Sequence, residues 1–281
     1  MSTFLVVGAN GTVASEVSRL LESAGHQVRR GTSRTPGAGQ VQLDLANGVG
    51  LDDAVRGADA VFAFAPPGFT NQDALLAPLF VAAKQAGVRK VVMMSAMGAN
   101  ASDEAPLRKA ELALEHSGLA WNVIRPNWFM QNFHTFWLHG ITNHNAIQLP
   151  VGTARTSFID ARDIASVAAS LLLRSDLDKQ AFDLTGTEQL DHSEVAALLS
   201  SALERPIRYE EITPDVMRGG LLAAGVPADY AEFLLMILSY LKAGYAERTT
   251  DAVATITGRA PRTFAEYARD FRTAYPEPVG V

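Results

Sequence analysis

Short apolar runs alternate with amphipathic stretches through the first 125 residues of the chain. The stretch ALLAPLFVAAKQAG (74–87), for example, repeats its apolar residues at helical spacing. Alternation of this kind predicts right-handed βαβ units and a parallel sheet with helices on both faces. Gly87 and Gly118 close two helical stretches, where glycine commonly caps a helix. The apolar runs that predict strands cover residues 4–8, 27–33, 41–45, 60–66, 90–95 and 121–126.

The pattern becomes irregular after residue 145. Asp191 and Glu194 have the spacing of a capping box, which predicts that a helix begins there. The other expected elements are a strand and a helix within 156–175, a strand within 181–186, helical structure over 213–246, and, within 257–271, a Pro-bearing turn followed by a final helix. We therefore predict an α/β fold, a Rossmann doubly wound parallel sheet with a smaller, mostly helical C-terminal region.

A glycine-rich loop follows the first apolar run. Gly8, Gly11 and Ala14 form the pattern G-x-x-G-x-x-A between that run and a helical stretch. Gly8 permits a tight turn, Gly11 leaves room for a pyrophosphate, and Ala14 lets the helix approach the strand. The helix N-terminus offers N–H groups and a partial positive charge to the phosphates. The loop therefore predicts an NAD(P)-binding Rossmann domain over residues 1–145, and residues 146–281 remain as a substrate-binding region that partly completes the sheet.

The end of the second strand indicates which dinucleotide is bound. An acid there would hold the ribose hydroxyls of NAD, but the sequence has Arg29, Arg30, Ser33 and Arg34, and no acid before Asp44. A guanidinium beside hydroxyl groups suits a 2′-phosphate. We predict NADP(H), with Ser33 and Arg34 as contacts; the alternative is that the arginines only solvate a loop. Asp44 is either an adenine contact or an acid that caps a helix.

Composition narrows the possible partners. A net charge of −6 and the lack of a Lys/Arg run argue against nucleic acid and anionic membranes. The chain has no cysteine, which excludes disulfides and thiolate zinc sites. His134, His139 and His144 recur without a carboxylate among them, so we predict no metal site. Without a signal peptide or a long apolar segment, we expect a cytoplasmic monomer or homodimer that acts on a small molecule.

Longer motifs resemble one family. VVGANGTVA, VFAFAPP, VVMMSA and ALEHSGLAWNVIRPNWFMQNF are similar to those of the NmrA-like atypical short-chain dehydrogenases. The tail TDAVATITGRAPRTFAEYARDF resembles that of the bacterial branch related to ergot-alkaloid (festuclavine or agroclavine) dehydrogenases. The resemblance spans essentially the whole chain and implies a Rossmann sheet that binds NADP(H). Members of this family include quinone, triphenylmethane-dye and iminium reductases, and redox-sensing regulators without turnover.

The resemblance also implies which residues line the cofactor and the substrate. All of them follow the carboxyl ends of predicted strands, where an open α/β sheet binds its ligands. Trp128 and Phe129 would flank the nicotinamide and the substrate. The implied cofactor contacts are Gly8, Asn10, Gly11, Thr12 and Val13 at the pyrophosphate, Ala65, Pro66 and Pro67 at the riboses, Ser95 and Ala96 beside the nicotinamide ring, and Pro126 and Asn127 after the sixth strand.

The usual proton donor of a short-chain dehydrogenase is missing. None of the six tyrosines has a lysine four residues later. Many NmrA-like reductases carry a lysine or histidine before the glycine equivalent to Gly118, at the position that Leu107 occupies here. Lys109 lies about 200° further around a helix, and is either a catalytic or ribose-binding lysine or a solvated residue. Glu111, four residues before Glu115, indicates a polar helix face.

This absence restricts the chemistry. Reduction of an ordinary ketone creates an alkoxide, and a positioned acid contributes about 10²- to 10⁴-fold to such steps. A quinone, an iminium or an enone needs less help. We therefore predict an NADPH-dependent reductase of a conjugated, pre-activated acceptor, with Ser95 and Lys109 as the candidate catalytic residues. The alternatives are an NADP(H)-binding redox-sensing regulator and a tailoring cyclase or isomerase.

Aromatic side chains after the sixth strand suit a flat, electron-poor acceptor. The apolar segment 231–245 is either a lid over the substrate or a core helix, with Met236 and Tyr240 as possible contacts. The predicted substrate-binding residues are Met97, Trp128, Phe129, Phe133 and Tyr240.

Overall fold

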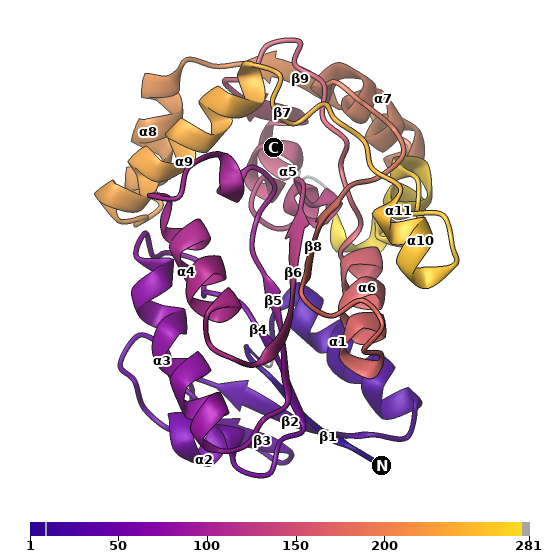
Figure 1. Cartoon of the computed structure of the whole chain (residues 1–281). Coiled ribbons are helices and arrows are strands. Elements are labelled where there is room, and N and C mark those ends of the chain that lie inside the picture. The colour runs from indigo at the N-terminus through magenta and orange to yellow at the C-terminus, as the bar shows by residue number, and fades with distance from the viewer. Residues whose placement is uncertain (9, 277–281) are drawn as a thin grey trace. The chain divides into compact units, whose positions relative to one another are not determined.

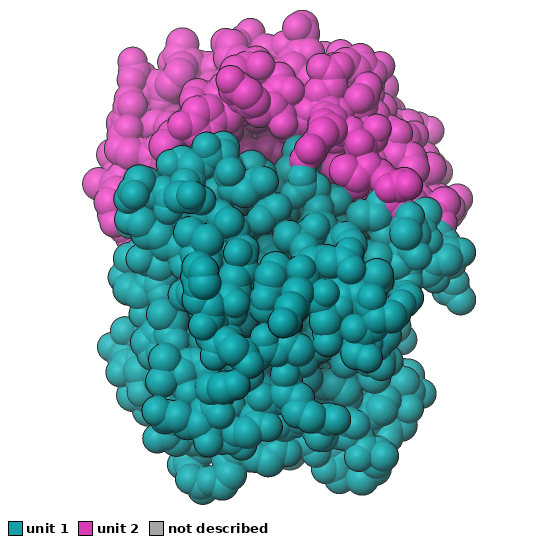
Figure 2. Space-filling model, in the orientation of Figure 1, with its two compact units in different colours: residues 1–126, 162–184, 252–259 teal, residues 127–161, 185–251, 260–281 magenta. Residues whose placement is uncertain are grey.

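A computed structural model describes residues 1–8 and 10–276 and divides the chain into two compact units (Figure 2). Unit 1 comprises residues 1–126, 162–184 and 252–259, and unit 2 comprises residues 127–161, 185–251 and those from 260 onward. The division expected at residue 145 does not coincide with this one, because the chain leaves unit 1 at residue 127 and returns to it twice. Residues 277–281 of the expected substrate region lie outside the described residues.

Unit 1 is built on a seven-stranded parallel sheet with the order β3-β2-β1-β4-β5-β6-β8 (Figure 1). Its strands are β1 (Thr3–Val6), β2 (Gln27–Thr32), β3 (Gln40–Gln42), β4 (Ala60–Ala63), β5 (Lys90–Met94), β6 (Ala120–Pro126) and β8 (Gln180–Leu184). The strand order reverses between β1 and β4, as in dinucleotide-binding Rossmann sheets. The Rossmann fold and the six expected N-terminal strands are confirmed.

Helices cover both faces of this sheet. Figure 1 shows α3 and α4 on one face, with α1 and α6 on the other. The helical elements of unit 1 are α1 (Thr12–Ser23), α2 (Leu51–Val55), α3 (Gln72–Gln85), η1 (Ala99–Ala101), α4 (Pro106–Glu115), α6 (Ala161–Leu173) and α10 (Ala252–Thr257). Gly87 directly follows the C-cap of α3, and both Gly87 (φ 77°) and Gly118 (φ 76°) have the left-handed conformation expected of a capping glycine.

Unit 2 contains a small parallel sheet of β7 (Ala146–Leu149) and β9 (Arg208–Glu211). Neither strand was predicted, because each has only four residues and its partner lies far away along the chain. The helical elements of this unit are η2 (Met130–His134), α5 (Leu138–His144), α7 (His192–Leu203), α8 (Pro214–Ala223), α9 (Ala228–Lys242), α11 (Phe264–Asp270) and η3 (Arg272–Ala274). No helix within the described part of the chain is long and apolar enough to cross a membrane.

The sequence predicted some elements of unit 2 and its borders correctly and others wrongly. The capping box of α7 is confirmed, since the Asp191 side chain accepts from Glu194 N (2.8 Å) and Glu194 accepts from Asp191 N (2.9 Å). The strand expected near residues 156–160 is wrong, because this segment makes only isolated bridges. The final helix expected after a Pro-bearing turn within 257–271 is confirmed as α11, which begins after Pro261. The short α10 before it, which ends at Gly258 (φ 72°), was not predicted.

Candidate functional site

The glycine loop joins β1 to α1. Gly8 has a φ of 72°, and its carbonyl accepts a hydrogen bond from Gly11 N (2.8 Å), so the tight turn expected here is present. A Cβ on Gly8 would lie 2.6 Å from the Phe64 ring. Gly11 is the N-cap of α1, no described side chain caps it, and the first turn carries no acid. The backbone N–H groups of the first turn of α1 are therefore available to an anion such as a pyrophosphate.

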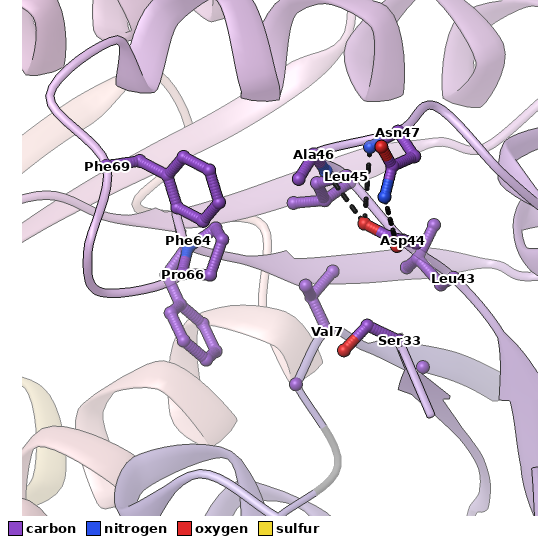
Figure 3. A pocket seen from close by; sticks show the side chains of 12 residues that line it. Val7, Ser33, Leu43, Asp44, Leu45, Ala46, Asn47, Phe64, Pro66 and Phe69 are labelled. Atoms are coloured by element: carbon purple, nitrogen blue, oxygen red, sulfur yellow. Dashed lines mark hydrogen bonds between the residues drawn. The ribbon is translucent and has the colours of Figure 1, made fainter. Parts of the chain in front are cut away.

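A pocket of about 290 Å³ lies beside this loop, at the carboxyl ends of the strands (Figure 3). Its walls are mostly apolar, with a few polar groups from Ser33, Asp44 and Asn47, as is usual for small-molecule sites. The volume suits one nucleoside rather than a whole dinucleotide. The lining residues are Val7, Gly8, Gly31, Ser33, Leu43, Asp44, Leu45, Ala46, Asn47, Phe64, Pro66 and Phe69.

Asp44 shapes one wall of the pocket. Its carboxylate accepts from Ala46 N (3.0 Å), Asn47 N (3.2 Å) and Asn47 Nδ2 (2.8 Å), as Figure 3 shows. The Asn47 side chain, more than the backbone N–H groups, holds the pKa of Asp44 below its usual value. Asp44 therefore caps a turn and not a helix, since α2 begins later, behind Gly50. A contact with adenine stays a prediction.

The arginines near β2 differ in whether they are already engaged. Arg29 donates to the backbone carbonyls of Asp53 (2.6 Å) and Arg56, and Arg30 pairs with Glu22 (2.6 Å). The exposed Arg34 guanidinium has no such partner among the described residues, and it follows Ser33, which lines the pocket. Of these three arginines, Arg34 alone is thus available to a 2′-phosphate.

Ser95 continues the sheet beyond β5. Its N–H donates to Ile124 O (2.8 Å), and Met97 N donates to Pro126 O (3.0 Å), so this loop stays paired with β6. The Ser95 hydroxyl is buried and has no hydrogen-bond partner among the described residues, although it lies near enough to Glu111 to help lower its pKa. A buried hydroxyl without a partner is costly, and a carboxamide or a substrate oxygen could satisfy it.

Glu111 is not on a polar helix face, so that expectation is wrong. Its side chain is fully buried, and its carboxylate accepts from Arg125 Nε (2.9 Å) and Nη2 (2.6 Å) and from Arg108 Nη1 (3.0 Å). Burial alone would raise the pKa of Glu111, but Arg125, with help from Ser95 and Arg108, holds it below its usual value. The sequence signal was an arginine within the apolar run of β6, since a buried charge needs a partner.

Lys109 lies on another side of α4. Its ammonium pairs with Glu104 (2.8 Å), and its side chain is 45% exposed. The structure thus places Lys109 in the solvated position that the sequence left as one alternative, and a catalytic role stays a prediction.

The expected residues after β6 are buried or half-buried. Asn127 is buried, and its amide donates to Ser157 Oγ (2.7 Å) and Ala246 O (2.8 Å), so it fixes this segment within unit 2. Trp128 and Phe129 are half-buried, and the Trp128 ring stacks on Trp137 with centroids 5.8 Å apart.

Other expected substrate contacts lie apart from these. Phe133 is fully buried among the rings of Trp137, Phe158 and Phe264, which makes it a core residue. On α9, Tyr240 is 52% exposed and Met236 is 42% exposed, while the leucines of the opposite side are buried. The described residues include no cluster of three metal-ligating side chains.

The fold and these features define the chain as a dinucleotide-binding Rossmann protein. The chain belongs to the NmrA-like family, whose family model matches residues 1–268. It is 34% identical to the NAD(P)H azoreductase of Xenophilus azovorans, over 96% of this chain and 98% of that protein. It is 30% identical to the festuclavine dehydrogenase of Aspergillus fumigatus, over 95% and 96%. The family resemblance seen in the sequence motifs is confirmed.

A solved structure shares the fold. The triphenylmethane reductase of Citrobacter sp., complexed with NADP(H), superposes with a TM-score of 0.81 at 20% identity, covering 96% of this chain and 99% of that chain. This likeness establishes the Rossmann architecture of both proteins.

Replacing Gly8 with alanine should weaken dinucleotide binding. The new Cβ would meet Phe64 at 2.6 Å and would strain a φ of 72°. The free loop relieves this overlap by shifting, and NADPH must restore the binding geometry against an overpacking cost of about 1–3 kcal/mol. The Kd for NADPH, measured by calorimetric titration, should therefore rise roughly 5- to 150-fold. Gly25→Ala is the matched control, since Gly25 has a φ of 81° but no atom within 4 Å of its Cβ position. Equal Kd values for the two variants would contradict the role of the loop.

Proposed function

We propose that this protein is an NADPH-dependent reductase that transfers hydride to a conjugated, pre-activated acceptor such as a quinone, an iminium or an enone. That it is an NAD(P)H-dependent reductase follows from its family and from relatives named as NAD(P)H azoreductase and festuclavine dehydrogenase. The acceptor class is inferred from one observation. The buried Ser95 hydroxyl after β5 has no hydrogen-bond partner among the described residues, Lys109 pairs with Glu104 at the surface, and no tyrosine lies four residues before any lysine of the sequence.

The residues present fit the cofactor. The glycine loop and the N-terminus of α1 would hold the pyrophosphate, and the pocket lined by Ser33 and Asp44 would hold the adenosine. When bound, NADPH supplies the hydride. Ser95 would then orient the nicotinamide carboxamide through its buried hydroxyl, which has no hydrogen-bond partner among the described residues. Positioning and desolvation suffice for an acceptor whose conjugation accommodates the incoming electron pair.

Arg34 is expected to select NADPH over NADH. Arg34→Ala removes a charge-assisted contact to the 2′-phosphate that is worth about 1.5–3 kcal/mol, so the Kd for NADPH should rise about 10- to 150-fold while that for NADH stays unchanged. Arg30→Ala is the control, because Arg30 already pairs with Glu22. Unchanged NADPH binding in Arg34→Ala, or an equal loss in Arg30→Ala, would contradict the assignment.

The function itself is tested by NADPH consumption against a panel of acceptors. Quinones, cyclic iminiums, enones, azo dyes and cationic triphenylmethane dyes form the panel, with simple ketones as the negative set. We expect turnover with members of the first group and none with the ketones. Tight NADP⁺ binding without any turnover would overturn the proposal and favour a redox-sensing regulator.

A further inference from the structure

A second pocket lies wholly within unit 2. It has a volume of about 280 Å³, and its walls come from residues 202–205 at the end of α7 and from residues 272, 273, 275 and 276 in and after η3. None of these residues lines the pocket beside the glycine loop. The volume is near the lower limit of small-molecule sites, about 300 Å³, so this pocket can hold a small ligand that is separate from the dinucleotide.

Two arginines line this pocket. The Arg205 guanidinium makes one hydrogen bond to a described residue, from Nη1 to Asn145 Oδ1 (2.7 Å), and its Nη2 is buried without a partner. Arg272 is exposed, and its guanidinium has neither an ion pair nor a hydrogen bond within the described part of the chain. Because a guanidinium carries five N–H donors, most donors of both side chains are unused, and an anion would supply the missing acceptors.

Arginines without a carboxylate are a minority in this chain. Most of the others form an ion pair with Asp or Glu, in helices as well as across the sheet. Arg205 and Arg272 form none with a described residue, and although they lie far apart in sequence they line the same pocket. Their meeting therefore points to an external anion.

The local charge favours a dianion. The two guanidinium groups are opposed by Glu204, the C-cap of α7, and by the carbonyl end of that helix, which carries about half a negative charge. Only a ligand that contacts both guanidinium groups gains enough attraction to offset these. A phosphate monoester carries a charge of about −1.5 to −2 near pH 7 and three acceptor oxygens, which match the guanidinium fork.

We propose that this pocket, the unit 2 anion site, binds a phosphate dianion through Arg205 and Arg272, either free or as the head of a small monoester. The remaining walls, from Ala202, Leu203 and Thr273, would contact an organic part. The site uses no residue of the cofactor pocket, so the inference does not depend on the proposed function.

Arginine side-chain NMR tests the site. Protein labelled with ¹⁵N-arginine is saturated with NADP⁺, so that the glycine loop is occupied, and is titrated with glycerol 3-phosphate at constant ionic strength. The Nε signals of Arg205 and Arg272, identified by their loss in Arg205→Lys and Arg272→Gln, should move together with a single Kd. Arg272→Gln, which changes an exposed and unpaired side chain, should raise the Kd read from Arg205 about 10-fold or more, as for loss of a charge-assisted hydrogen bond.

Arg259→Gln is the matched control. Arg259 is exposed, lines neither pocket and has no ion pair among residues 1–8 and 10–276, so its loss changes the net charge equally without touching the site. Its Kd for glycerol 3-phosphate should equal that of the unchanged protein. Unmoved Arg205 and Arg272 signals, or the same rise in Kd for Arg259→Gln as for Arg272→Gln, would overturn the inference.

Two further anions define the ligand. Inorganic phosphate should move the same two signals. A Kd above that of glycerol 3-phosphate assigns the site to a monoester, and an equal or lower Kd assigns it to free phosphate. Succinate, a dianion without a phosphate group, should bind more weakly, and tighter binding of succinate would overturn the assignment to phosphate.

The outcome is separable from that of the proposed function. If NADP⁺ does not bind, the proposed function fails, but the movement of the Arg205 and Arg272 signals and its dependence on Arg272→Gln still decide whether the unit 2 anion site exists.

Discussion

Glu111→Leu should lower the free energy of unfolding by about 3–5 kcal/mol, the cost of removing one partner of a buried ion pair. The leucine would leave the guanidinium groups of Arg125 (10% exposed) and Arg108 (17% exposed) without the carboxylate that they share. Asp183 would remain 3.7 Å from Arg125 and Glu115 2.6 Å from Arg108, but Glu111 is the carboxylate that pairs with both guanidinium groups at 3.0 Å or less. The charge would remain beneath Ser95, so the cofactor end of β5 should loosen as well.

Urea denaturation followed by tryptophan fluorescence measures this change. Glu104→Gln is the control, because it breaks only the solvent-exposed pair with Lys109 and should have no measurable effect. Adding Arg125→Met to Glu111→Leu should restore part of the loss, since an apolar pair can replace a buried ionic one. If Glu111→Leu unfolds at the same urea concentration as the unchanged protein, the network is not a source of stability.

Acidification should destabilise the protein through His192. This side chain is fully buried, neither ring nitrogen has a partner among the described residues, and the rings of Phe133, Trp137, Phe158 and Tyr209 surround it. Burial lowers the pKa of His192 from 6.5 to about 4, against a weaker opposing effect of Asp191. The unfolded chain therefore binds a proton below pH 6.5 that the folded chain refuses until about pH 4.

The sign and size of this effect follow from proton linkage. Above pH 6.5 His192 is neutral in both states and does not make the free energy of unfolding depend on pH. Below pH 6.5 the free energy of unfolding falls by about 1.4 kcal/mol per pH unit, and by about 3 kcal/mol in total at pH 4. His192→Phe should remove this pH dependence. It should also raise the free energy of unfolding at pH 7 by about 1–3 kcal/mol, because a buried polar group without a hydrogen-bond partner is removed from the core.

The measurement is the difference between unfolding free energies of His192→Phe and the unchanged protein from pH 7.5 to 4. His139→Phe, which changes an exposed histidine, serves as the control. A difference that stays constant across this range would show that His192 titrates alike in both states.

Local sequence determined the fold and the cofactor loop. Apolar runs bounded by turns specify the strands of unit 1, because strands buried on both faces must be apolar along their whole length. Gly8 has the left-handed conformation that its place in the loop required, and Asp191 and Glu194 form the capping box that their spacing predicts. Each of these features depends on neighbours within a few residues, so the sequence alone could reveal them.

The tertiary structure decided which charged and hydrogen-bonding groups meet. Glu111 on α4 and Glu115 one turn later look alike in sequence, but only Glu111 meets Arg125 across the face of the sheet. Arg29, Arg30 and Arg34 likewise differ only through the distant groups that they reach. The hydrogen bond between Tyr267 and His134 joins elements 133 residues apart, so no spacing along the chain indicates it. Hydrogen bonds and ion pairs depend on distance in space, so a linear pattern determines the scaffold here, and the packing of that scaffold determines which polar groups can act.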